Sequence, residues 1–240
     1  MTTLDLPAPT RALAIGAHPD DVEFGCGATL AKWAATGSET HILVLTDGSK
    51  GSWDPKEDPQ VLADRRIHEQ ALAAAKLGTS KIHVGGLIDG ELYNGRGERE
   101  AVVAVIRRIK PDIVLTHDPW KRYRLHPDHR AAGYLVLDSI VAARDPHYFS
   151  HLKDAPHRPD QILLFEAEEV DHLELVDEFV DTKINALLAH HSQWRSTMGI
   201  DVASPDADAQ RFSFASRIRA EAESMGGGRP AEAFKRIADV

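Results

Sequence analysis

Short apolar runs alternate along this chain with longer segments in which apolar residues recur every three or four positions. The apolar runs predict buried strands at 11–17, 40–46, 81–84, 112–116 and 161–166. The segments 64–77 and 99–110 have the apolar spacing of helices, and each is followed by a plausible stop, Gly78 or Pro111. Nearly continuous apolar strands that alternate with helices are typical of parallel βαβ units. We therefore predict an α/β, Rossmann-like fold: a mostly parallel sheet with helices on both faces.

Three stretches between these elements read as loops. Residues 47–58 and 117–125 are polar segments that follow predicted strands, so both belong at the carboxyl side of the sheet. Residues 145–160 carry three prolines and predict a surface excursion. In open α/β folds, ligands bind at the carboxyl edge of the sheet, so the active site is expected at the carboxyl ends of the strands.

Two motifs place histidines and carboxylates at the ends of predicted strands. His18-Pro19-Asp20-Asp21-Val22-Glu23 follows the first strand and precedes Gly25-Cys26-Gly27, which opens a helical pattern running to about Trp33. His126-Pro127-Asp128-His129 follows the strand at 112–116 across a polar loop. If these strands are neighbours, the motifs meet at one edge of the sheet. His18, Asp21 and His129 would then suit a divalent, zinc-like ion with an open coordination position.

These motifs resemble those of the zinc-dependent N-acetylglucosaminyl deacetylase family, called PIG-L or LmbE-like. Ala17 to Gly27 repeats the family pattern of a strand, Ala-His-Pro-Asp-Asp-x-Glu and a Phe-Gly-Cys-Gly-like segment. Further matching segments follow in the family's order: Leu45 to Gly48, Arg66 to Glu69, Asp89 to Leu92, His126 to His129, Lys183 to Gln193 and Ala231 to Phe234. Together they span nearly the whole chain.

The resemblance implies a metal site and a general base. It assigns His18, Asp21 and His129 as ligands of one zinc ion per chain, with iron(II) as the alternative metal, and Asp20 as the base. The residues themselves agree, because metal-assisted amide hydrolysis needs three ligands, an open position and an adjacent carboxylate. The competing interpretation is a capped turn, in which Asp20 or Asp21 accepts helix N–H groups.

Roles for the second motif follow from the same resemblance. His126 is expected to bind the oxyanion or to protonate the leaving amine, and Asp128 to orient a neighbouring histidine. A helix N-cap is an equal alternative for Asp128. Cys26 is a rival metal ligand, although a packing site for a small apolar side chain is the simpler interpretation.

Substrate contacts are predicted from three other segments. Arg66 matches a family arginine, although Arg65 stands beside it. Asp47 and Asp89 could bind sugar hydroxyls or stabilise their own Asp-Gly turns. The cluster Lys121 to Arg124 reads as a substrate clamp or loop anchor, with a solvated loop tip as the alternative, so Tyr123 and Arg124 are candidate contacts. In the family branch that acts on the inositol-glucosamine precursor of mycothiol, a tyrosine stands where this chain has Arg124.

Composition narrows the remaining possibilities. At 240 residues, the chain fits a single domain over 1–240. Its 28 Lys and Arg against 37 Asp and Glu give a net charge of −9, and without a basic stripe we expect no nucleic-acid partner. With one cysteine, no leader-like segment and no apolar run near the length of a membrane span, a soluble cytoplasmic protein without membrane contact is expected.

We therefore expect a zinc-dependent hydrolase that removes an N-acyl group, most simply N-acetyl, from an amino sugar or a glycoside-like metabolite. The resemblance also implies a homo-oligomer, a trimer or hexamer. One alternative is an amidase acting on a thiol-conjugate amide. The other is a non-catalytic sugar- or nucleotide-binding module, although the first strand is followed by no Gly-x-Gly-x-x-Gly, which disfavours dinucleotide binding.

Overall fold

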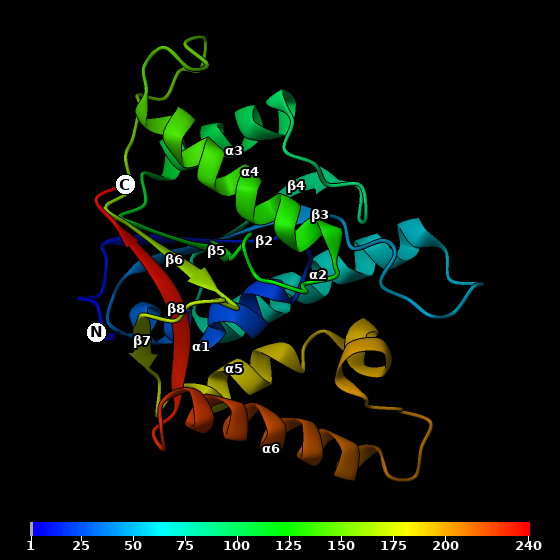
Figure 1. Ribbon diagram of the computed structural model, residues 1–240. Coiled ribbons are helices and arrows are strands. Elements are labelled where there is room, and N and C mark those ends of the chain that lie inside the picture. The colour runs from blue at the N-terminus through cyan, green and yellow to red at the C-terminus, as the bar shows by residue number, and fades with distance from the viewer. Residues whose placement is uncertain (1) are drawn as a thin grey trace.

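The computed structural model describes residues 2–240, and its strands form one eight-stranded sheet in the order β1-β7-β8-β6-β5-β2-β3-β4. All neighbours run parallel except β8, which is antiparallel to both β6 and β7 (Figure 1). The strands are β1 (Thr3–Leu4), β2 (Arg11–Gly16), β3 (Glu39–Thr46), β4 (Lys81–Leu87), β5 (Ile113–His117), β6 (Gln161–Phe165), β7 (His172–Leu175) and β8 (Ala231–Ala238).

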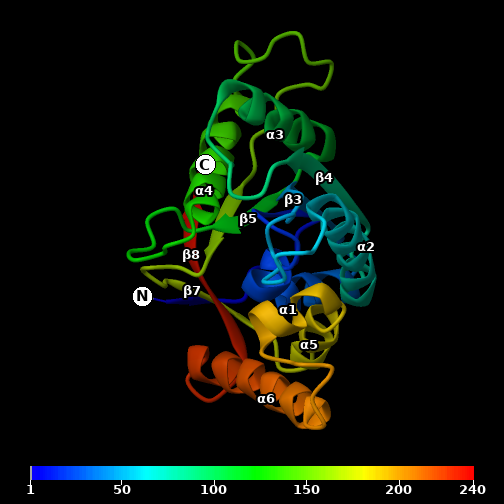
Figure 2. The ribbon, with the colours of Figure 1, turned by 90° about the vertical axis from the view of Figure 1, so that its right-hand side faces the viewer.

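Helices cover both faces of this sheet, as predicted. They are α1 (Asp21–Ala35), α2 (Pro59–Leu77), α3 (Arg96–Ile109), α4 (Pro127–Arg144), α5 (Val180–Leu187) and α6 (Ala207–Met225), with a 3₁₀ turn η1 (His191–Gln193) and a π turn η2 (Trp194–Met198) after α5. The pair α3 and α4 packs on one face, α1, α2 and α5 lie on the other, and α6 lies outside α5 (Figure 2).

The side chains of β2 point alternately to the two faces of the sheet, and each face carries its own hydrophobic core. Leu13 and Ile15 pack with the apolar residues of α3 and α4, whereas Ala12 and Ala14 pack with those of α1 and α2. Successive strand residues point to opposite faces, so an apolar run without polar interruptions is buried on both sides.

Local signals fix the ends of the best-defined helix. Before α2, the side chain of Asp58 accepts the N–H groups of Gln60 and Val61, and Pro59 occupies the first turn. Gly78 ends the helix in the left-handed region with φ 73°. The helix therefore starts five residues before the predicted 64 and ends where predicted.

Two expectations about elements were wrong or incomplete. Helix α1 begins at Asp21 rather than near Gly25, and it contains a break at Cys26, whose φ and ψ are −152° and 22°. Strands β1, β7 and β8 were not predicted. The Ala, Glu, Lys and Arg residues of β8 favour a helix, but pairing with β6 and β7 overrides that preference.

The position of the two motifs follows from strand order. Strands β2 and β5 are hydrogen-bonded neighbours with Ala12 opposite Ile113 and Ile15 opposite Thr116, so the segments after them meet at the carboxyl edge. None of the described helices combines the length and the apolar character needed to cross a membrane.

Candidate metal centre and catalytic site

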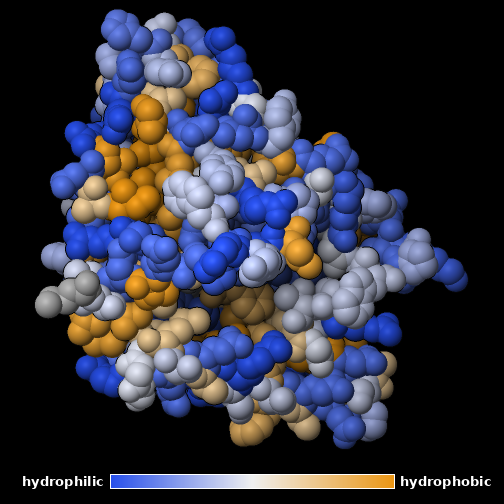
Figure 3. All heavy atoms as spheres, viewed as in Figure 1, coloured by the Kyte–Doolittle hydropathy of each residue, from blue (hydrophilic) through white to orange (hydrophobic). Residues whose placement is uncertain are grey.

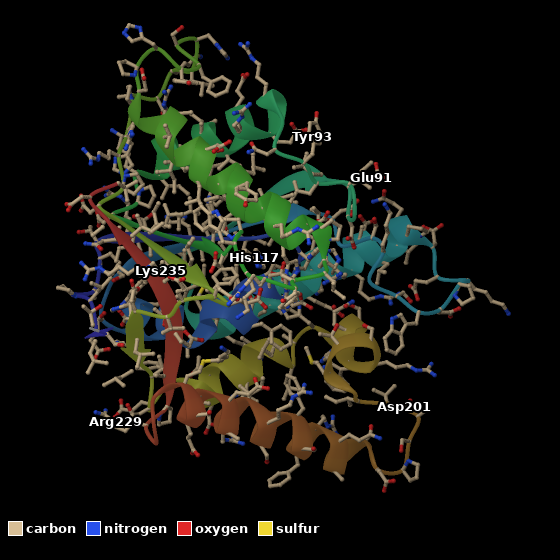
Figure 4. All side chains as sticks on the ribbon, viewed as in Figure 1. Glu91, Tyr93, His117, Asp201, Arg229 and Lys235 are labelled. Atoms are coloured by element: carbon tan, nitrogen blue, oxygen red, sulfur yellow. The ribbon has the colours of Figure 1, made fainter. Side chains whose placement is uncertain are left out.

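Three imidazoles surround the carboxylate of Asp21. Nδ1 of His18 and Nε2 of His117 each lie 3.2 Å from Oδ2 of Asp21, and Nε2 of His129 lies 3.3 Å from Oδ1. The side chains come from the turn between β2 and α1, the end of β5 and the first turn of α4. Figure 4 shows His117 in the dense group of side chains where these elements meet. The structure thus brings together the three predicted ligands and adds a residue that was not predicted.

Sequence reasoning missed His117. It directly follows the apolar run 112–116, at the same edge as the two motifs, but it belongs to no motif and was assigned to a loop. It is 1% exposed, its Nε2 accepts the N–H of Ala17 at 3.3 Å, and its Nδ1 lies 3.3 Å from Oε2 of Glu166. Its place directly after a buried apolar run, at the edge of the sheet where the site was expected, could have identified it as a candidate.

The donor set fits a divalent cation. Among the described residues, three groups of three side chains have ligand atoms within 4.8 Å of one another: His18, His126 and His129; Asp21, His117 and His129; and His18, Asp89 and Asp128. The predicted ligands His18, Asp21 and His129 are divided among these groups, and Asp21 contacts each of the two histidines. Burial alone lowers the pKa of His18, but Asp21, Asp128 and Asp89 together raise it to about 12. These carboxylates therefore favour a positive charge among them, and imidazole and carboxylate donors are those that zinc prefers.

Asp128 and Asp89 hold His18 from the side away from Asp21. Oδ2 of Asp128 lies 3.2 Å from Nε2 of His18, and Oδ1 of Asp89 lies 3.1 Å from the same atom. Asp128 also accepts the N–H of Gly90 at 2.7 Å, whereas the N-cap position of α4 is His126. Of the two alternatives for Asp128, the structure favours orientation of a histidine over capping.

Asp20 is buried beside this cluster in a strained backbone conformation with φ 96°. Gln70 accepts its N–H at 3.1 Å, and Nη2 of Arg66 lies 3.4 Å from its Oδ2. Gln70 and Arg66 are four residues apart on α2, so they project from one side of the helix. Burial raises the pKa of Asp20, Arg66 opposes the rise, Asp21 adds to it, and the pKa is about 6.

Glu23 of the first motif binds Gln70, the residue that accepts the N–H of Asp20. Nε2 of Gln70 donates to Oε1 of Glu23 at 2.6 Å, and Nε2 of His190 lies 3.6 Å from Oε2 of Glu23. Glu23 and His190 are both fully buried. Glu23 therefore fixes the amide of Gln70 that holds Asp20, and it lies against His190 in the segment after α5.

A cavity of about 630 Å³ opens over these groups, a volume in the usual range for small-molecule sites. The space-filling view is hollowed near the middle of the face seen in Figure 3. The ring of His126 stands at the cavity, 4.6 Å from that of His18 and 4.9 Å from that of His129 between centroids. Burial, His18 and His129 lower the pKa of His126, so its neutral form is favoured.

The predicted substrate contacts divide into two groups. Arg66, Asp89 and Arg124 line the cavity, whereas Asp47 and Tyr123 do not. Asp47 accepts the N–H groups of its own turn and of the next loop, at Ser49 (3.0 Å) and Asp89 (3.1 Å). Tyr123 is 92% exposed.

The basic cluster is anchored to the segment after β6. Lys121 donates to the carbonyl of Ala167 at 3.1 Å, and Arg124 pairs with Glu166 at 2.8 Å. The loop-anchor interpretation therefore describes this cluster better than a solvated tip. Cys26 is fully buried in the core on the α1 face, in agreement with a packing role.

Comparison with known proteins agrees with this geometry. The family model PIG-L, described as GlcNAc-PI de-N-acetylase, matches residues 13–140, more than half of the chain. Diacetylchitobiose deacetylase of Thermococcus kodakarensis is 35% identical over 187 residues, which cover 77% of this chain and 70% of that protein.

Two further matches differ in coverage. A 1D-myo-inositol 2-acetamido-2-deoxy-alpha-D-glucopyranoside deacetylase of Streptomyces griseus is 34% identical over 179 residues, covering 64% of this chain but only 54% of that protein. The solved structure of N,N'-diacetylchitobiose deacetylase from Pyrococcus horikoshii, complexed with its inhibitor MPG, superposes with a TM-score of 0.84 at 27% identity. That match covers 96% of this chain and 84% of the other.

Proposed function

Because this chain belongs to the PIG-L family of de-N-acetylases, we propose that it is a zinc-dependent deacetylase that hydrolyses the N-acetyl amide of an amino sugar. The observation that carries this proposal is the set of three imidazoles around Asp21, with the buried carboxylate of Asp20 beside it at the floor of one cavity.

His18, Asp21 and His129 would hold the zinc ion, with iron(II) as the alternative metal. Zinc in such a site supplies Lewis acidity toward a carbonyl oxygen and toward water. Asp20 takes the proton of the attacking water, which requires its carboxylate form. Arg66 and Gln70 fix Asp20 for that transfer, since they bind its carboxylate and its backbone N–H.

The ring of His126 lies beside those of His18 and His129, two of the residues that would hold the ion. The N–H of its neutral imidazole can donate to the oxyanion of the tetrahedral intermediate, where charge develops. Its exposed position at the cavity leaves it free to reach the leaving amine. Asp128 and Asp89 keep the ring of His18 turned so that Nδ1 faces Asp21.

The relatives favour an acetylated amino sugar over a thiol-conjugate amide or a non-catalytic module. The two curated relatives described above are named as deacetylases of diacetylchitobiose and of a GlcNAc-inositol. Arg124 at the cavity, in place of the tyrosine of the mycothiol branch, supports a substrate other than the GlcNAc-inositol. A trimer or hexamer stays a prediction, which light scattering in solution would test.

The test is amine release from a panel of N-acetylated substrates, with N,N'-diacetylchitobiose, N-acetylglucosamine, a GlcNAc-inositol and an N-acylated thiol conjugate in separate assays. The protein is stripped with a chelator, and zinc or iron(II) is then added back. We expect amine release only with metal and only from acetylated sugars. Zinc-loaded protein that releases no amine from any sugar would overturn the proposal.

A further inference from the structure

Glu166 stands one residue beyond β6, in a backbone conformation that glutamate rarely adopts. Its φ is +54°, in the left-handed region that favours glycine. Phe165, the last residue of β6, pairs with His117, the last residue of β5, so Glu166 leaves the sheet directly beside the site. Strained residues of this kind persist when the surrounding structure holds them, and they cluster at functional sites.

The carboxylate of Glu166 contacts three groups of the site. Its Oε2 lies 3.3 Å from Nδ1 of His117 and 3.6 Å from Nδ1 of His129, and its Oε1 lies 2.8 Å from Nη2 of Arg124. Both imidazoles turn their other nitrogen, Nε2, toward Asp21. Glu166 therefore lies on the Nδ1 side of two rings whose Nε2 atoms both face Asp21.

Nδ1 of His129 has two neighbours with opposite hydrogen-bonding roles, a donor and an acceptor. Arg124 donates to this atom, with its Nε at 2.9 Å, whereas Glu166 can only accept from it. When Arg124 donates to Nδ1, that atom carries no proton. The proton of the neutral ring is then on Nε2, the nitrogen that faces Asp21. When Nδ1–H donates to Glu166, the lone pair of Nε2 is free for a cation. The tautomer that binds metal is thus the one that Glu166 accepts from.

We propose that Glu166 is a positioning residue for the metal: it selects the ligating tautomer of His129, orients His117 and competes with His129 for the guanidinium of Arg124. This inference rests on the zinc site proposed above. Carboxylates that accept the second N–H of a ligand histidine fix its orientation and raise its basicity, and their loss weakens metal binding by ~10–100-fold.

The test measures the zinc affinity of metal-free protein by competition with a chromophoric chelator. Glu166→Gln keeps the size of the side chain and removes its charge, and Glu166→Gly suits the positive φ. We expect both variants to bind zinc ~10–100-fold more weakly than the wild type. The thermal midpoint of metal-free Glu166→Gly should equal or exceed that of the wild type, which separates loss of the site from loss of the fold.

Glu168→Gln is the matched control, because Glu168 lies two residues away and pairs with Arg122 and Lys121 outside the cavity. Its zinc affinity should equal that of the wild type. Unchanged zinc affinity in Glu166→Gln and Glu166→Gly would overturn the inference. A loss of zinc affinity in Arg124→Ala as large as that in Glu166→Gln would also overturn it, because Glu166 would then support the metal only by positioning Arg124. Wild-type protein that binds no zinc would instead overturn the proposed function.

Discussion

The guanidinium of Arg66 lies 3.4 Å from the carboxylate of Asp20, and both side chains are buried. Arg66 also donates to the carbonyl of Pro19 at 2.5 Å and to that of Gly48 at 3.0 Å. One side chain therefore holds the turn that contains Asp20 and the loop after β3. Its main contacts are with the protein, although its surface also forms part of the cavity wall.

Arg66→Lys should lower turnover ~10-fold or more while zinc stays bound. An ammonium cannot reproduce the planar fork that reaches two carbonyls and a carboxylate, and a charged hydrogen bond contributes about 1.5–3 kcal/mol. Steady-state kinetics on the sugar substrate and metal analysis of the same sample check this. Arg65→Lys is the matched control, because Arg65 is exposed and pairs with Glu57. Equal losses in both variants would contradict the assignment.

The paired carboxylates should separate into two phenotypes. Asp20→Asn keeps the shape but removes the base, so turnover should fall by ~10²-fold or more with zinc retained. Asp21→Asn should instead weaken zinc binding, because Asp21 is the group that all three imidazoles face. Zinc content and turnover, measured on the same preparations, distinguish loss of the base from loss of a ligand. The reverse pattern would mean that the two roles are exchanged.

Arg124→Ala should raise KM for the sugar substrate by at least ~10-fold while changing hydrolysis of a minimal N-acetyl amine little. The side chain lines the cavity and is partly exposed, so it can donate charged hydrogen bonds to a bound substrate, each worth about 1.5–3 kcal/mol. Kinetics on both substrates form the test. Equal loss on the two would place Arg124 in the catalytic machinery, and no loss on either would exclude it as a contact.

The parts of the site that could be predicted from sequence are those encoded by contiguous motifs at strand ends. His18 and Asp21 share one turn, and the adjacency of β2 and β5 brings His129 to them. His117 and Glu166 were missed, because each is a single polar residue after an apolar run and only strand pairing places them together. Likewise, only burial distinguishes Arg66 from Arg65, since the two are adjacent in the sequence.

His83 should make stability depend on pH below the neutral range. Its Nε2 lies 3.3 Å from Nδ1 of His41, and burial, then His41 and Lys81, lower its pKa from 6.5 to about 4. Between these two values the unfolded chain binds more protons than the folded chain. The stability from neutral His83 is therefore complete above pH 6.5 and lost as the pH falls toward 4.

His83→Gln should flatten this part of the profile. We expect its thermal midpoint to fall less than that of the wild type between pH 6.5 and pH 4, with midpoints taken from thermal melts on metal-free protein. His68→Gln, at an exposed position of α2, is the control and should keep the slope of the wild type. A slope unchanged in His83→Gln would contradict the prediction.

The break in α1 at Cys26 is bridged by a buried ion pair from two distant elements. Glu232 on β8 accepts the N–H groups of Ala28 at 3.1 Å and Thr29 at 2.7 Å, as a capping residue does at a helix start. Lys183 on α5 donates to the carbonyl of Phe24 at 2.7 Å and to Glu232 at 2.6 Å. The pair thus satisfies backbone groups on both sides of the break.

Glu232→Gln should destabilise the protein by about 3–5 kcal/mol, because it leaves the buried ammonium of Lys183 without its counter-charge. Urea unfolding of metal-free protein measures the loss. Lys183→Met should cost a similar amount, and the double variant should cost less than the two single losses combined, since the second change removes a charge that the first left unpaired. Lys235→Met on the same strand breaks a partly exposed pair with Asp171 and should change stability little. Figure 4 shows Lys235 on β8, away from His117. Strict additivity of the two buried substitutions would mean that Glu232 and Lys183 stabilise α1 independently rather than as a pair.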